Sequence, residues 1–452
     1  MAYTAQSLAT IIKSYDIRGL VGTEITPEFC RDVGIAFAHL VKAKEIVVGF
    51  DMRPSSPSLV AAFSEGVRAT GTNVINIGLA ATDQLYYATG ILNIPGVMFT
   101  ASHNPASYQG MKLARECARP IGVLSGLEDI RAALIDRKLP VTHQQGSERS
   151  IDMLEGYGQY LRKLVPCEDI RRLKVVVDAG NGMAGHTVPS VLGSLNLEII
   201  PMYFELDGTF PNHEANPLDS STLVDLQARV VSEKADLGLA FDGDADRCFL
   251  VDEYGKIVEP SLLTALIAES ELKRAPGSTI IYSLISSKIV PEVIRENGGV
   301  ASRSRVGHSY IKDQMAQTNA IFGGEHSGHF YFREFWNADS GMLAALYAIA
   351  ALGKTPPGTG FSSLMSRFRK YVGSGEINSK VADVGAATQR VAERFGQRGE
   401  IDRLDGLTIT AKTWWLNVRP SNTEPLLRLN VEAENDDVMC RIRDEALEVI
   451  RQ

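Results

Sequence analysis

Three features that mark particular protein classes are scarce in this sequence. Only five cysteines occur in 452 residues and none forms a Cys-x-x-Cys pair, which argues against a disulfide-stabilised scaffold and a cysteine zinc site. The longest run of small and apolar residues, 342–352, is too short to span a bilayer, so we predict a buried helix there. The segment 1–19 lacks a basic start followed by an apolar core, so we expect no secretory signal and a soluble, cytoplasmic protein.

An excess of basic residues is also absent. The 46 lysines and arginines are outnumbered by 54 aspartates and glutamates, which gives a formal net charge of −8. This balance argues against nucleic acid or an anionic membrane as a partner, although a small anionic ligand needs only a local positive pocket. Because 44% of the residues are hydrophobic and 22% are charged, disordered and coiled-coil proteins are excluded. At about 100–200 residues per domain, the length predicts three or four domains.

One pattern occurs three times: an apolar strand, a polar loop, an amphipathic helix and a second strand. The copies begin with the strands 46–50, 175–177 and 280–282. A unit of this kind, about 20–30 residues long, is typical of βαβ structure. We therefore predict three α/β domains of similar build with mixed sheets, although one large α/β domain would also contain such units. Beyond the glycine- and proline-rich stretch 353–360, two strand-like segments and a final helix predict a small α+β domain.

The segment 100–105, Thr-Ala-Ser-His-Asn-Pro, is the first candidate site. It follows the apolar run 97–99, and Asn-Pro forces a turn, so we expect Ser102 where a strand ends in a turn, with little bulk from Ala101 beside it. A serine hydroxyl in such a place can act as a nucleophile or phosphate carrier, with His103 as its neighbour. The alternative is a capped turn at the start of a helix, which the segment taken alone favours.

The segment 242–247, Asp-Gly-Asp-Ala-Asp-Arg, lies between two apolar runs. In an extended chain alternate residues point the same way, so the carboxylates of Asp242, Asp244 and Asp246 are expected to converge. A hard divalent cation relieves their repulsion, and the segment therefore predicts a metal site. A solvated acidic turn is the alternative, whereas an EF-hand is disfavoured because Arg247 stands where that loop requires glycine.

The segment 323–329, Gly-Gly-Glu-His-Ser-Gly-His, is the third candidate site. Glu325 and Ser327 share one face of an extended segment, and a carboxylate beside a hydroxyl suits two neighbouring sugar hydroxyls. A plain glycine-rich turn is an equal alternative. A metal pair of His326 and His329 is disfavoured, because no further ligand lies nearby in the sequence.

The fourth candidate site is the segment 419–425, Arg-Pro-Ser-Asn-Thr-Glu-Pro, between two strand-like runs. A guanidinium followed by three short polar side chains collects hydrogen-bond donors in a tight loop, which resembles a phosphate cradle. A hairpin turn rich in turn-forming residues is an equal alternative. The donors of the proposed cradle are Arg419, Ser421, Asn422 and Thr423.

A fifth motif, Gly-x-Gly-x-x-Gly at Gly180–Gly185, supports a different protein class. It follows a strand, and Glu205 lies 25 residues beyond its first glycine, which is the context of a dinucleotide-binding fold. An NAD-dependent oxidoreductase is therefore an alternative function. That interpretation leaves Ser102, the three aspartates and the Arg419 loop without a role.

A serine, a divalent-metal loop, a sugar-reading loop and a phosphate clamp, one per unit, describe phosphoryl transfer on a phosphorylated sugar. In these four motifs and their order, the sequence resembles the α-D-phosphohexomutase family, in its phosphomannomutase/phosphoglucomutase branch, over essentially the whole chain. The resemblance implies three related α/β domains and a C-terminal α+β domain around a central active-site cleft. We place the boundaries of these domains at 1–145, 146–254, 255–362 and 363–452.

The resemblance also implies roles for individual residues. Ser102 carries the phosphoryl group and holds Mg²⁺ together with the three aspartates of 242–247, while Arg247 neutralises the same phosphate. Lys112 and His308 match the general acid/base candidates of the family. Ala245 stands where the family usually has glycine, a change that we expect to be tolerated. The residues implied to contact the substrate are Tyr15, Arg18, Glu325, Ser327, His329, Arg419, Ser421, Asn422 and Thr423.

The implied activity interconverts hexose 6-phosphate and hexose 1-phosphate through a phosphoserine and a sugar 1,6-bisphosphate. The segment 329–341 looks closer to phosphomannomutases than to other branches, so we expect mannose phosphate as the preferred substrate and glucose phosphate as a second one. A phosphoglucosamine mutase of the same family and a non-catalytic sugar-phosphate binding protein are the alternatives. The expected partners are small sugar phosphates, with no nucleic acid and no membrane, and we expect a monomer or homodimer.

Overall fold

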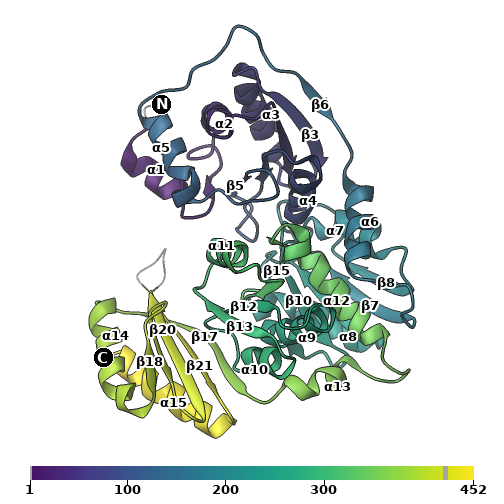
Figure 1. The fold of residues 1–452 in the computed structure, drawn as a ribbon, viewed down its shortest axis with the longest axis vertical. Helices are drawn as coiled ribbons and strands as arrows, with labels where there is room; N and C mark the ends of the chain where they lie inside the picture. Colours follow the sequence, from purple (N-terminus) through teal and green to yellow (C-terminus); the bar gives the residue numbers. More distant parts are fainter. Residues whose placement is uncertain (1–2, 421–425) are drawn as a thin grey trace. The chain divides into compact units, whose positions relative to one another are not determined.

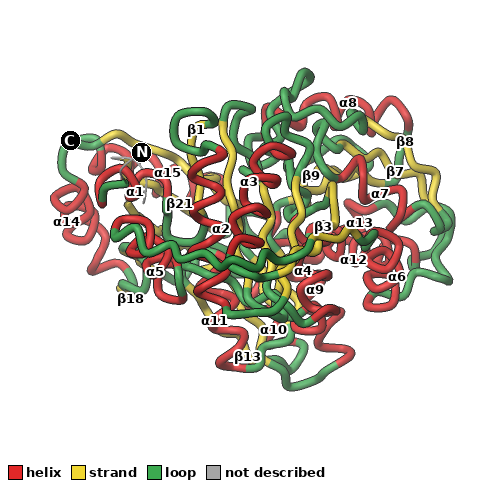
Figure 2. Tube along the Cα trace, turned by 90° about the horizontal axis from the view of Figure 1, so that it is seen from above, coloured by secondary structure: helices red, strands yellow, loops and turns green. Residues whose placement is uncertain are grey.

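The computed structural model describes residues 3–420 and 426–452. The chain forms two compact units, the first made of 1–260 and 327–364 and the second of 261–326 and 365–452. Strands and helices alternate along most of the chain (Figures 1 and 2). The strands form four sheets. None of the helices in the described part of the chain is both long and apolar enough to cross a membrane.

The first sheet is mixed and six-stranded. Its order is β1 (Ile17–Leu20), β5 (Tyr108–Ala114), β4 (Gly96–Phe99), β2 (Glu45–Phe50), β3 (Asn73–Leu79) and β6 (Glu148–Ser150). Strand β2 pairs in parallel with both β3 and β4, whereas β5 pairs antiparallel with β4 and β1. Its helices are α1 (Ala5–Ile11), α2 (Pro27–Val41), α3 (Ser56–Ala69), α4 (Thr82–Leu92) and α5 (Leu127–Ile135). The predicted first βαβ unit is therefore present as β2, α3 and β3.

The second sheet has the order β11 (Ile257–Val258), β10 (Cys248–Asp252), β9 (Leu237–Phe241), β7 (Leu173–Asp178) and β8 (Leu197–Met202). Strand β7 pairs in parallel with β8 and β9, and β10 returns antiparallel to β9. Its helices are α6 (Leu154–Leu164), α7 (Ala184–Leu192) and α8 (Val224–Glu233). Strands β9 and β10 are buried on both faces, which explains why their sequences are almost wholly apolar.

A third α/β region includes parallel strands in the second unit. Strand β12 (Thr279–Ser283) pairs with β13 (Val300–Ser304) and β14 (Phe322–Gly324), next to α9 (Pro260–Arg274), α10 (Ile289–Glu296) and α11 (His308–Thr318). In the first unit, β15 (Phe330–Phe332) pairs antiparallel with β16 (Ala338–Asp339) before α12 (Gly341–Gly353). Nearly every residue of α12 is buried, so the run 342–352 is a core helix as predicted.

The last sheet is wholly antiparallel, as expected for an α+β domain. Its order is β17 (Val372–Lys380), β21 (Leu426–Ala433), β20 (Trp414–Pro420), β19 (Leu407–Thr410) and β18 (Glu400–Asp402). Helices α14 (Val384–Phe395) and α15 (Asp436–Ile450) pack against one face and share a core with it (Figure 1). A short helix, α13 (Phe361–Met365), precedes this domain.

The loops that carry the predicted chemistry follow the carboxyl ends of buried strands. The segment 100–105 follows β4, and the segment 242–247 follows β9 and leads into β10. Ligands of α/β proteins bind at this edge of the sheet, because the loops there are free of the strand ladder and converge. Within the first unit, the fold therefore brings the serine loop of one sheet against the acidic loop of another.

Candidate active site

Ser102 lies in a strained turn directly after β4. Its backbone has φ 51°, in the left-handed region that a residue with a Cβ rarely adopts. The Ser102 hydroxyl is buried and donates to Asp242 Oδ2 at 2.7 Å, and it lies 3.2 Å from His103 Nδ1. The residues that follow form turns and then β5, without a helix. The alternative of a helix cap is therefore wrong, and the turn instead aims the hydroxyl at the acidic loop.

Asp242, Asp244 and Asp246 converge as predicted, although through a turn, in which the Ala245 N–H donates to the Asp242 carbonyl at 3.0 Å, and not through an extended segment. All three are buried, and one oxygen of each lies within 4.8 Å of the others. Their burial excludes a solvated acidic turn. Asp244 Oδ1 and Asp246 Oδ1 are buried with no hydrogen-bond partner in the part of the chain that the structure describes. Two open carboxylate oxygens in a buried acidic cluster are the ligands that a hard divalent cation prefers, so the residues fit a metal ion.

Two cations partly balance these three carboxylates. Lys112 Nζ lies 2.7 Å from Asp244 Oδ2 and 2.5 Å from Asp246 Oδ2. Arg247 Nε donates to Asp242 Oδ2 at 2.9 Å. Burial raises the pKa of Asp242 to about 8, with the neighbouring aspartates adding to the shift and Arg247 opposing it. Burial also acts to raise the pKa of Asp244, but the Lys112 ammonium lowers it overall.

The acidic loop itself contains a strained position. Ala245 has φ 60°, in the region where glycine is preferred because it has no Cβ to clash. This backbone conformation explains why the family is expected to have glycine at position 245. The loop nevertheless closes with alanine, whose side chain is buried.

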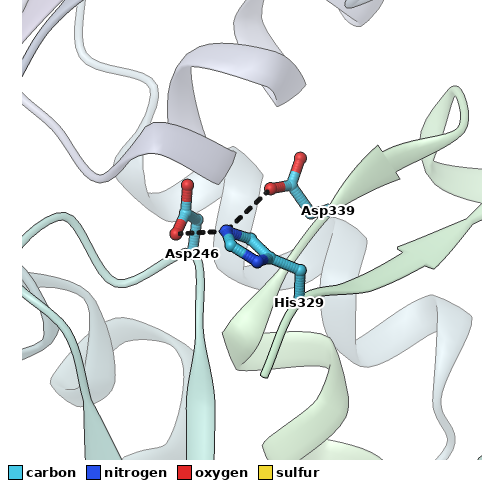
Figure 3. Close-up of side chains that lie close together, drawn as sticks. All are labelled: Asp246, His329 and Asp339. Atoms are coloured by element: carbon cyan, nitrogen blue, oxygen red, sulfur yellow. Dashed lines mark ion pairs between the residues drawn. The ribbon is translucent and has the colours of Figure 1, made fainter. Parts of the chain in front are cut away.

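His329, which is distant in the sequence, lies close to Asp246 of the acidic loop (Figure 3). Its Nε2 lies 3.6 Å from Asp246 Oδ1 and 4.0 Å from Asp339 Oδ2, and its Nδ1 lies 2.9 Å from Ser327 Oγ. These three residues form a second group with metal-ligand potential. The carboxylate neighbours of His329 come from the acidic loop and from β16, which its sequence neighbours do not reveal. His326 is not part of this group, so the structure gives no support to the disfavoured pair of His326 and His329.

Arg18, one of the two N-terminal residues predicted to line the site, lies beside the serine loop. Arg18, in β1, donates to Asn104 Oδ1 at 2.5 Å and to Asp16 Oδ2 at 2.5 Å. Tyr15 is half-buried two residues before β1. Burial, with Arg247 and Arg18 nearby, lowers the pKa of His103 well below its usual value. These surroundings favour the neutral imidazole of His103, which lies next to the Ser102 hydroxyl.

The sequence-based reasoning missed Arg53, which holds the backbone of the serine loop through hydrogen bonds. Its buried guanidinium donates to four backbone carbonyls, and its Nε donates to Asp51 Oδ2 at 3.1 Å. A Phe210 ring lies 5.1 Å from the guanidinium carbon, a cation–π distance. The only sequence signal for Arg53 was its place in the polar loop after strand 46–50. That loop lies at the same edge of the sheet as the segment 100–105, because β2 and β4 are parallel neighbours. The carbonyls that accept from Arg53 belong to Ser102, Asn104, Pro105 and Tyr108, at 2.7–3.0 Å.

The glycine motif 180–185 is explained by packing. A Cβ on Gly182 would lie 2.7 Å from the carbonyl oxygen of Gly243, and one on Gly185 would lie 2.2 Å from that of Phe204. The Met183 N–H donates to Gly243 O at 2.9 Å. Gly182 therefore allows the turn before α7 to pack closely on the acidic loop, and Gly185 allows α7 to pack on the backbone of Phe204, which accounts for the motif without a dinucleotide.

The remaining predicted residues belong to the second unit, apart from Ser327. Glu325 follows β14, and its Oε1 accepts from the Gly307 N–H at 2.9 Å. His308 is the first residue of α11, and its side chain lies outside the described residues. Arg419, near the end of β20, donates to Glu376 Oε2 at 2.6 Å. Ser421, Asn422 and Thr423 also lie outside the described residues.

Comparison with known proteins agrees with this arrangement. The phosphoglucomutase/phosphomannomutase alpha/beta/alpha domains I, II and III match residues 9–131, 155–255 and 259–371, and the C-terminal domain of the same family matches 376–449. A phosphomannomutase from Salmonella typhimurium is 37% identical over 447 residues, covering 97% of this chain and 98% of the relative. A protein of Xanthomonas campestris described as phosphohexose mutases is 40% identical over 439 residues, covering 96% and 97%.

Solved structures show the same fold. A phosphoglucomutase/phosphomannomutase family protein from Burkholderia thailandensis matches with a TM-score of 0.89 and 29% identity, over 100% of this chain and 98% of that one. An N-acetylphosphoglucosamine mutase from Aspergillus fumigatus, in complex with GlcNAc-6P and magnesium, matches at 0.62 with 11% identity, over 99% and 97%. The family matches together cover most of the sequence, so the resemblance seen in its motifs is confirmed. The chain belongs to the phosphoglucomutase/phosphomannomutase family and is an isomerase that moves phosphate on hexose phosphates.

Proposed function

We propose that the protein moves the phosphoryl group through Ser102, with mannose phosphate as the preferred sugar and glucose phosphate as a second substrate. The observation that carries this proposal is the buried Ser102 hydroxyl, 2.7 Å from Asp242 Oδ2 in the acidic cluster. The names of the relatives, which are phosphomannomutases and phosphohexose mutases, support the choice of sugar.

The metal that we propose for the acidic cluster is Mg²⁺. Three carboxylates against Lys112 and Arg247 leave about one negative charge if all three are ionised. Oxygen ligands of this kind suit Mg²⁺, and the fungal N-acetylphosphoglucosamine mutase was solved with magnesium. When bound, Mg²⁺ supplies positive charge against the oxygens of the phosphoryl group.

In the first transfer, the bond between phosphorus and Ser102 Oγ breaks, and a bond forms between phosphorus and the free sugar hydroxyl. The hydroxyl proton leaves to a base, and the Oγ receives a proton. The Asp244 and Asp246 carboxylates outweigh the effect of burial and raise the pKa of Lys112 well above its usual value, so Lys112 stays protonated and supplies positive charge beside the phosphoryl group. It is also our candidate for the acid. His308 is then our candidate for the base. The second transfer, from the sugar 1,6-bisphosphate back to Ser102, reverses these steps at the other hydroxyl.

Sugar and phosphate recognition falls to the remaining residues. We assign the sugar hydroxyls to Glu325 and Ser327, and the non-reacting phosphate to Arg419 with the segment 421–423. Arg419 is 7% exposed, and its Nε has no hydrogen-bond partner among residues 3–420 and 426–452. A buried guanidinium with a spare donor is suited to a phosphate oxygen.

The decisive experiment maps phosphate on the protein and measures turnover of three sugars. Peptide mass mapping after incubation with glucose 1,6-bisphosphate is expected to place phosphate on Ser102. Ser102→Ala is expected to abolish mutase activity, whereas Ser107→Ala, at an exposed position of the same loop, retains it. Full activity of Ser102→Ala would refute the phosphoserine mechanism. A kcat/KM that is highest for glucosamine phosphate would refute the proposed sugar preference.

A further inference from the structure

The first residue of helix α4 contacts the acidic loop twice. The Thr82 N–H donates to the Asp244 carbonyl at 3.0 Å, and its Oγ1 donates to Asp244 Oδ2 at 2.6 Å. Thr82 has no exposed surface. The two residues are 162 positions apart in the sequence, and Thr82 follows β3 of the first sheet whereas Asp244 follows β9 of the second. Helix α4 of the first α/β domain therefore hydrogen-bonds both the backbone and the carboxylate of Asp244 in the second.

The hydroxyl of Thr82 determines which oxygen of Asp244 is left open. Oδ2 accepts from both Thr82 Oγ1 and Lys112 Nζ, at 2.6 and 2.7 Å. Oδ1 is buried and has no hydrogen-bond partner in the described part of the chain. With one oxygen held by two donors, the carboxylate cannot rotate freely. The other oxygen remains available to a cation.

The start of α4 is itself held in place by its neighbours. The next residue, Asp83, accepts from the Tyr157 hydroxyl at 2.7 Å and from Ser340 Oγ at 2.6 Å. The Ala81 N–H is satisfied by Gln84 Oε1. Tyr157 belongs to α6, and Ser340 caps α12. The buried hydrogen bonds of Asp83 therefore link α4 to α6 and α12. They fix the position of the neighbouring Thr82 hydroxyl without a metal ion.

We propose that Thr82 is a positioning residue for the metal site, whose hydroxyl orients Asp244 so that Oδ1 is presented to a divalent cation. This proposal rests on the proposed binding of Mg²⁺ by the aspartates. Removing a hydrogen-bond partner of a metal ligand typically costs about 10–100-fold in metal affinity. The same contact makes the site depend on the docking of two domains, because the ligand and its support come from different sheets.

The test compares two threonines of the same helix. Thr82→Val keeps the side-chain shape and removes the hydroxyl, and Thr89→Val is the matched control. Thr89 is also buried, but its hydroxyl donates only to the Tyr86 carbonyl. Calorimetric titration of the dephosphorylated full chain with Mg²⁺ alone is expected to give about 10–100-fold weaker binding for Thr82→Val. We expect Thr89→Val to remain within about twofold of the unmodified protein.

Two further variants separate orientation from folding. Thr82→Ser retains the hydroxyl, and Thr82→Ala lacks it, so the first is expected to bind Mg²⁺ at least about tenfold more tightly than the second. In a mutase assay, the Mg²⁺ concentration for half-maximal rate should shift in the same order, with excess Mg²⁺ restoring most of kcat. Equal Mg²⁺ affinity of the Ser and Ala variants would overturn the role of Thr82. No Mg²⁺ binding by the unmodified protein would instead refute the proposed metal function and, with it, this role.

Discussion

Asp83 is a buried carboxyl group whose acidity the fold changes strongly. Burial raises its pKa from 3.8 to about 7, hydrogen bonds from Ser340 and Tyr157 oppose the shift, and the charges of Asp246 and Asp339 add to it. In the unfolded chain the group returns to an ordinary pKa. The folded state therefore binds one more proton than the unfolded state between pH 4 and 7. Stability must fall as the pH rises through this window, because unfolding releases the proton of Asp83 and a higher pH favours that release.

The size of the effect follows from the shift. A difference of about 3 pKa units corresponds to about 4 kcal/mol of destabilisation once the pH lies above 7. Asp83→Asn resembles the protonated acid, since its amide is neutral and its oxygen can still accept from Tyr157 and Ser340. We therefore expect the variant to match the unmodified protein only below about pH 4, to exceed it by about 1–2 kcal/mol at pH 5, and to exceed it by up to about 4 kcal/mol at pH 8.

Urea unfolding of metal-free protein at pH 5, 6, 7 and 8 measures this difference. Asp169→Asn is the matched control, because Asp169 is exposed and its removal should leave the pH dependence unchanged. A parallel pH dependence in Asp83→Asn and the unmodified protein would show that Asp83 does not hold its proton in the folded state. The reasoning from burial would then be wrong.

Two further predictions concern the acidic loop. Ala245→Gly is expected to raise the free energy of unfolding by about 1 kcal/mol, because alanine at φ 60° pays a left-handed strain that glycine avoids; urea unfolding that shows equal or lower stability would contradict this. Lys112→Met is expected to lower the mutase rate by about 100-fold or more, the range of general acid catalysis. The same variant should tighten Mg²⁺ binding in a calorimetric titration, because the ammonium beside Asp244 and Asp246 no longer repels the cation, while Thr82 still holds Asp244 Oδ2. Unchanged or weaker Mg²⁺ binding would show that Lys112 supports the metal instead of opposing it.

Features that depend on neighbours in the sequence were predictable. The βαβ units, the core helix α12 and the α+β character of the last domain follow from the spacing of apolar residues, because that spacing decides which face of an element is buried. The convergence of Asp242, Asp244 and Asp246 was also predicted, but from an extended segment, whereas the structure brings the three together through a turn with Ala245 at φ 60°. The four motifs in their order were also sufficient to identify the family, which the comparisons confirm.

Local patterns left other questions undecided. The glycine motif 180–185 suits a phosphate-binding turn and a tightly packed turn equally well, because both need glycine for close backbone approach. The contact with Gly243 decides between them. In the same way, a turn with Ser102 serves a helix cap or a nucleophile, and the burial of its hydroxyl against Asp242 selects the second.

By itself, the sequence determined which elements form, which residue types could perform phosphoryl transfer, and the family to which the chain belongs. Only the tertiary structure decided which groups meet. The support of the serine loop by Arg53, the grip of Thr82 on Asp244, and the approach of His329 to Asp246 each join residues from distant parts of the chain. Such contacts depend on which strand ends share an edge and how two sheets dock, and no spacing along one segment encodes that.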